Sequence, residues 1–258
     1  MWRKEQQRIE FFNSEPSIID NFPIIEAKDL KLKWVQGAKK DFQKRVRDPD
    51  TLKKEGYEFK HIVRCPGIFD LFKCGYIVTL HKDVVIKSER EDFSALDSTK
   101  KGNNEEEKDD NHTHYGTFIS HQPITFVGSP PWATDYIIKL NTGWHVVAPE
   151  GVRFLQIPIS YPDTFDFTCV TGIFDPAIAT EVNFQMYWNV KEAETLIRAG
   201  TPLGHLIPLT EKRYEWVQRI MNEKDRDWVK KSISAYSSSF AMSSMRGKVV
   251  EMYKKYWK

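Results

Sequence analysis

The chain has 258 residues, of which 40% are hydrophobic and 29% charged, and its formal charge at pH 7 is +2. These values are typical of a folded globular protein, and so small a charge gives no support to nucleic-acid binding over the whole surface. No run of residues approaches the roughly 18 apolar residues that a membrane span requires, so we expect no membrane partner. Three cysteines without paired spacing, Cys65, Cys74 and Cys169, predict reduced thiols.

Residues 1–60 form a mixed, polar N-terminal segment with one basic stretch. Residues 28–47 contain eight lysines and arginines against two aspartates, with Trp34 and Phe42 between them. Such a segment can follow a phosphate backbone and stack on bases, which makes nucleic acid a candidate partner. The alternative is a solvated face that a few aromatic rings anchor.

Residues 61–209 have the pattern of a β core. Val182, Phe184, Met186 and Trp188 alternate with polar residues or Tyr187, as in a half-buried strand. Shorter candidate strands lie at residues 62–63, 75–80, 84–86, 118–119, 124–127, 135–140, 144–148 and 152–158. Strands at roughly ten-residue spacing are typical of a sandwich or barrel, so we expect a mainly β, barrel-sandwich fold.

Two features interrupt this core. Pro66 and Gly67 predict a turn between the first two strands. Residues 97–116 contain no apolar side chain until Tyr115, and we expect a disordered loop there, between strands.

Residues 210–258 change to helical spacing, which predicts one or two C-terminal helices. Thr210 is a candidate N-cap for a helix ending near Lys230 and Lys231. The apolar face of that helix would be Tyr214, Val217, Met221 and Trp228. A last helix would carry the stripe Met242, Met245, Val249, Met252 and Tyr256. This methionine-rich stripe either packs on the β core or binds a partner or a second copy.

The order of motifs from Thr171 to Leu209 resembles that of the dUTPase and dCTP-deaminase-like β-clip superfamily. The Gly-Ile-Phe-Asp turn at residues 172–175 is similar to that family's Gly-Val-Ile-Asp turn, and Leu-Gly-His-Leu-Ile-Pro at 203–208 to its Gln-Leu-Ile-like run. The chain also resembles an uncharacterised set of phage and bacterial proteins that share Pro-x-Gly, Gly-Ile-x-Asp and Gly-Thr-Pro…Ile-Pro. The resemblance covers roughly residues 135–209 and implies a β-clip fold and a phage origin.

The resemblance also implies candidate site residues. Asp175 matches the family's aspartate that orients or activates the hydrolytic water, and Gly172 opens the turn that faces the nucleoside. Ser160 lies where the family has an Arg-Ser pair, and Gly200 matches the glycine of its Gly-Asp-Arg motif.

The match stops after Asp175, where Pro176 replaces the family's continuation toward a deoxyribose-stacking tyrosine. The phosphate-binding arginine is missing too, and Arg153 or Arg198 could replace it. An enzyme of this kind would need Mg²⁺ to neutralise the triphosphate. The alternative is that Asp175 is an ordinary turn residue.

His81 and Asp83 form a His-x-Asp pair, which is the beginning of a non-haem iron site. Two residues apart on a strand, they would share a face, and a third ligand would come from His121, His145 or His205. The alternative is a plain hairpin turn at residues 82–83.

Three functions remain open. The leading hypothesis is a phage-type accessory or virion-associated protein, in the host cytoplasm or the virion, that binds or assembles on a β-clip scaffold without catalysis and without a cofactor. Its partners would be further copies of the chain, in a trimer as in dUTPase-like proteins, or a phage or host protein. The alternatives are a Mg²⁺-dependent nucleotide-binding or nucleotide-hydrolysing enzyme and a His/Asp metal protein.

Overall fold

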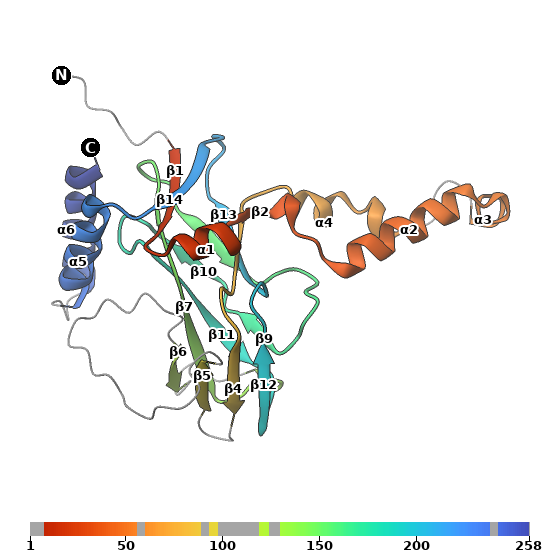
Figure 1. Cartoon of the computed structure of the whole chain (residues 1–258). Helices are drawn as coiled ribbons and strands as arrows, with labels where there is room; N and C mark the ends of the chain where they lie inside the picture. The colour runs from red at the N-terminus through yellow and green to blue at the C-terminus, as the bar shows by residue number, and fades with distance from the viewer. Residues whose placement is uncertain are drawn as a thin grey trace.

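Three β-sheets build the body of the protein (Figure 1). The structure, a computed structural model, describes residues 8–55, 60–88, 93–97, 119–123, 130–237 and 242–257. The first sheet has the order β14 (Glu215–Ile220), β1 (Arg8–Asn13), β7 (Tyr136–Val147), β11 (Glu181–Trp188) and β9 (Phe167–Cys169), and β6 (Ile119–Pro123) also pairs with β7. The second has the order β10 (Gly172–Phe174), β8 (Phe154–Ile157), β13 (Pro202–Pro208), β3 (Tyr76–Thr79) and β2 (Ile25–Glu26). The third consists of β12 (Ala193–Ile197), β4 (Val84–Ser88) and β5 (Phe93–Asp97).

The first two sheets pack face to face around one core. Phe11 on β1 contacts Tyr76 on β3, with ring centroids 5.1 Å apart, and Phe154 on β8 at 6.4 Å. Between the sheets a Cβ at Gly204 would lie 2.3 Å from the Phe184 ring, so only glycine fits that position. The prediction of a mainly β sandwich is confirmed, and the strands that the structure describes form open sheets, not a closed barrel.

Helices lie at both ends of the chain. The N-terminal ones are α1 (Pro16–Asn21), η1 (Ala27–Asp29), α2 (Lys33–Arg47), α3 (Pro49–Glu55), η2 (Ile62–Arg64) and α4 (Pro66–Leu71). The C-terminal ones are α5 (Glu223–Ser237) and α6 (Met242–Trp257), which cover the outer face of the first sheet through Phe12, Val147 and Trp228. The prediction of C-terminal helices on the β core is therefore confirmed. None of the described helices is long and apolar enough to cross a membrane.

The helix expected from Thr210 to Lys231 is wrong in its first half. Residues 215–220 form β14, which pairs in parallel with β1 from Arg8↔Glu215 to Asn13↔Ile220. The spacing of Tyr214, Val217 and Met221 is typical of a helix. The segment between Tyr214 and Met221 nevertheless forms a strand because it can pair with β1, and such tertiary contacts often override local preference. Strand β1 thus pairs both with β7 and with β14. These three strands come from the three segments that the sequence pattern separated at residues 60 and 209.

Two further expectations differ from the structure. Residues 62–71 contain η2 and α4 instead of a strand and a turn, because Pro66 is well suited to the first position of a helix. The two strands expected at 135–140 and 144–148 are one strand, β7, in which Gly143 takes a φ of 71° and the pairing with β11 shifts register. Residues 98–116, nearly all of the expected loop, lie outside the described residues.

A buried ionic cluster joins β1, β14 and the start of α5. The Arg219 guanidinium donates to Glu10 at 2.7 Å and makes two hydrogen bonds to Asp225, which has no exposed surface. Asp225 also accepts from the Asn222 backbone N–H at 2.8 Å, while the Asn222 side chain accepts from the Asp225 N–H at 3.0 Å. This reciprocal pair is a capping box, so it is Asn222 and not Thr210 that begins the helix.

Replacing Arg219 should strongly destabilise the fold. Arg219→Leu leaves Asp225 buried without its cation, which should lower the free energy of unfolding by about 3–5 kcal/mol. Urea unfolding at neutral pH measures this. The matched control is Lys231→Ala, which breaks an exposed ion pair with Asp227 and should change stability far less. Equal effects of the two variants would contradict a structural role for the cluster.

Candidate functional site

A pocket of about 390 Å³ lies where α6 meets two turns of the β body. The turn between β7 and β8 contributes Glu150 and Arg153, and the turn after β10 contributes Asp175. Helix α6 lines the remaining side with Val250 and Lys254. Asp175 and Arg153, which the nucleotide-enzyme hypothesis assigned to one site, therefore line one pocket.

Tyr253 holds α6 against this pocket. Its hydroxyl donates to the Ala148 carbonyl and accepts from the Ala148 N–H, both at 3.0 Å, and its ring centroid lies 5.6 Å from that of Trp228. Burial raises the pKa of Tyr253 above its usual value, so the hydroxyl stays protonated and can donate. At the rim, the Lys254 ammonium lies 2.6 Å from the Glu150 carboxylate.

The pocket combines acids and cations but offers little nucleophilic chemistry. One Asp175 carboxylate oxygen accepts from the Ala177 N–H at 3.1 Å, which is the role of a turn residue. The Arg153 side chain is exposed, and its backbone carbonyl accepts from Leu209. The described residues that line the pocket include no serine, cysteine or histidine.

The other ligand candidates are not brought together. Gly172 starts β10 and leads to Asp175, but Arg198 and Gly200 lie in the turn between β12 and β13. Ser160 precedes Tyr161, which contacts α2. The structure thus divides the predicted ligand set among three places.

The His81 and Asp83 pair lies beside the turn that holds Arg198. Asp83 accepts from the Ala199 N–H at 2.7 Å and is 3.5 Å from the Arg198 guanidinium. Within the residues that the structure describes, no cluster of three metal-ligating side chains was found.

The three histidines considered as third ligands have other surroundings. His145 is buried and stacked on Phe12, and burial lowers its pKa to about 4. Nε2 of His205 lies 2.5 Å from the Cys74 carbonyl oxygen. The His121 side chain lies outside the described residues.

The residues of the stripe predicted for α6 differ in how far they are buried. Val249 is buried and Tyr256 is half-buried, and both side chains face the protein, while Met252 is 37% exposed. The side chains of Met242 and Met245 lie outside the described residues. The described part of the stripe packs mainly on the chain's own helices and sheet.

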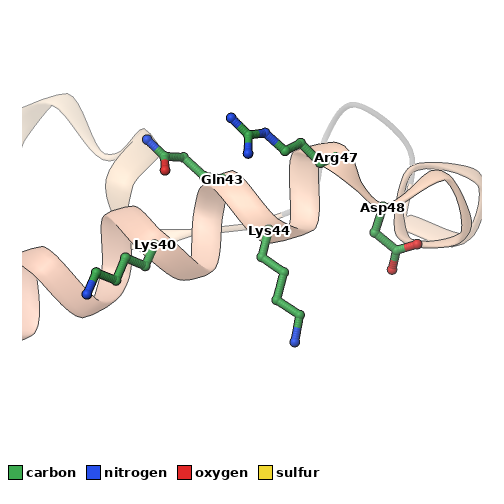
Figure 2. A pocket seen from close by; sticks show the side chains of 5 residues that line it. All are labelled: Lys40, Gln43, Lys44, Arg47 and Asp48. Atoms are coloured by element: carbon green, nitrogen blue, oxygen red, sulfur yellow. The ribbon is translucent and has the colours of Figure 1, made fainter.

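A second candidate site is the α2 arm, which we define as α2 and α3. The arm extends away from the sheets, and no residue of α2 is buried (Figure 1). At its base the Trp34 indole donates to the Tyr161 carbonyl at 2.8 Å, and the Lys33 N–H donates to Asp163 at 3.2 Å. Figure 2 shows Lys40, Lys44 and Arg47 extending from the helix farther along the arm.

Sequence reasoning missed the residues that complete both sites. Lys254, Tyr253 and Glu150 belong to segments that only tertiary packing brings together, and no local pattern marks them. For the arm, the basic composition was visible, but its projection from the body was not.

Comparisons with known proteins give little further guidance. No family model and no curated protein matches the chain. Among the solved structures that match is the native EIAV dUTPase, with 12% sequence identity and a TM-score of 0.28. The match covers 56% of this chain and 83% of the dUTPase chain. This is a weak, distant resemblance in fold, and we draw no function from it.

Removing one hydroxyl should loosen the wall of the pocket. Tyr253→Phe keeps the ring contact with Trp228 but leaves the buried N–H and C=O of Ala148 unpaired, which should cost about 1–3 kcal/mol. Amide hydrogen exchange in residues 247–257 should become faster. Met252→Ala, on the exposed side of α6, is the control and should leave exchange nearly unchanged. Equal exchange in both variants would show that the hydroxyl does not hold the helix.

Proposed function

We propose that the protein acts by binding a macromolecular partner with its α2 arm, which the β body holds in place, and not by catalysis. The observation that carries this proposal is the projection of α2 from the body with its cations facing outward. Most helices in proteins are stabilised by packing against the rest of the fold. Because α2 has no buried residue, packing does not explain why this helix extends from the body.

This proposal fits the accessory or virion-associated role that the sequence pattern suggests. The phage setting, in the host cytoplasm or the virion, rests on that pattern alone. The same holds for further copies of the chain, or a phage or host protein, as partners.

Binding through the arm can be tested with an immobilised sulfated polyanion such as heparin. Lys40→Gln/Lys44→Gln should elute at lower salt than the wild type, because each lost ionic contact reduces the salt dependence by about one unit. The control is Lys212→Gln/Arg213→Gln, which makes the same charge change at exposed residues before β14. Identical elution of the two variants would overturn the role of the arm.

A second candidate function is nucleotide binding or hydrolysis in the Asp175 pocket. The observation that favours it is that Asp175 and Arg153 line the same pocket as Lys254. In this hypothesis Asp175 positions water, Arg153 contacts phosphate, and Mg²⁺ neutralises the triphosphate.

Thermal unfolding with a panel of nucleotides, with and without Mg²⁺, tests the second candidate. It predicts stabilisation of about 2.7 kcal/mol by a nucleotide at about 100 times its dissociation constant. The shift should disappear in Asp175→Asn and persist in Arg198→Gln, since Arg198 lies outside the pocket. An unchanged midpoint across the panel would rule this function out.

A further inference from the structure

Four of the exposed cations of α2 lie on one side of the helix, while Lys39 lies on another side. Lys33, Lys40, Lys44 and Arg47 follow at offsets of 0, 7, 11 and 14 residues, and all four are exposed. At about 100° per residue these offsets fall within an arc of about 60°, and they extend over about 21 Å of the helix axis. We call these four residues the cationic face.

The other side of α2 has its own partners. Arg45 pairs with Asp41 at 3.0 Å, and Nε2 of His61 lies 3.3 Å from the same carboxylate. Phe42 packs on the His61 ring, with centroids 5.3 Å apart. The single acid within α2 is thus directed to the side that faces η2.

The cationic face itself makes no ion pair in the part of the chain that the structure describes. Asp48, just beyond its end, accepts from the Thr51 hydroxyl at 2.6 Å and from the Asp50 N–H at 3.1 Å. That carboxylate therefore caps α3. The Thr51 hydroxyl and, to a smaller degree, Lys44 lower the pKa of this carboxyl. Lys44 forms no ion pair with it, so all four cations remain available for an external anion.

The arrangement is unfavourable for the helix alone. Lys40 with Lys44, and Lys44 with Arg47, are like charges at spacings that bring side chains together. Lys33 is the first residue of α2, where the helix dipole disfavours a cation. The dipole favours cations only in the last turn, so it does not account for Lys33 or Lys40. Local rules broken without a structural gain are typical of functional sites.

We propose that the partner of the cationic face is a nucleic acid, held through its phosphate backbone. This inference rests on the proposed function and names the partner's chemical class. The residues beside the cations are Gln36, Gly37, Gln43 and Asp48, so the face offers no apolar core. Protein interfaces have apolar centres from which lysine is depleted, whereas phosphates are contacted by lysine, arginine and glutamine.

The charge distribution of the whole chain also favours this partner. Residues 33–55, which form the arm, carry eight lysines and arginines against four acids, while the whole chain has a charge of only +2. The remainder is therefore net negative and repels a polyanion. The net positive charge lies on the arm, which extends away from that remainder (Figure 1).

The test is fluorescence anisotropy with a short labelled duplex DNA and a single-stranded RNA, at several salt concentrations. Four phosphate contacts predict a slope of log K against log[salt] of about −3.6 for the duplex, or roughly a 100-fold loss of affinity over a fourfold rise in salt. In Lys40→Gln/Lys44→Gln/Arg47→Gln only one of the four contacts remains, so the slope should become shallower, at about −0.9. Glutamine is a good helix former, so α2 should stay folded, which circular dichroism verifies.

The control variant is Lys191→Gln/Lys212→Gln/Arg213→Gln, which changes three exposed cations of the β body and the net charge equally. It should keep the wild-type slope. Equal slopes for the two triple variants on both probes would overturn the proposal. If the arm variant loses retention on heparin while neither nucleic acid binds the wild type, the nucleic-acid proposal fails and binding through the arm remains.

Discussion

The bond network of Arg219 is the constraint on which most of the C-terminal structure depends. One guanidinium joins Glu10 on β1 to Asp225 at the start of α5, and it lies 5.1 Å over the Phe12 ring. Because α6 packs on α5 through Trp228, the position of α6 follows from this network. The Asp175 pocket is bounded by α6, so an ionic cluster far from that pocket in sequence defines one of its walls.

The fold was predictable wherever local pattern and final environment agree. Strand β11 alternates cleanly and was found from Val182 to Trp188, and β3, β4 and α6 were also found. Strand β14 was missed because its partner β1 lies about two hundred residues away, and no local periodicity reports such a partner. Helix α4 was missed because a Pro-Gly pair marks a helix start as well as a turn.

The candidate sites were predictable only in part, for the same reason. Asp175 was named from the order of motifs, and Arg153 as one of two replacements for a missing arginine, but nothing in the sequence showed that they share a pocket with Lys254. Lysines and arginines at residues 28–47 were visible as composition. The cationic face exists only once α2 is helical, because the rotation of about 100° per residue brings residues 7, 11 and 14 positions apart onto one side.

The parallel pairing of β1 with β14 has a consequence for the order of assembly on the ribosome. β1 also pairs with β7, so the sandwich can begin to form when the chain has been made as far as residue 147. The other edge of β1 stays unpaired until β14, which ends at residue 220, has been made. During that interval an unpaired row of backbone groups is exposed, which is the kind of edge that chaperones protect during synthesis.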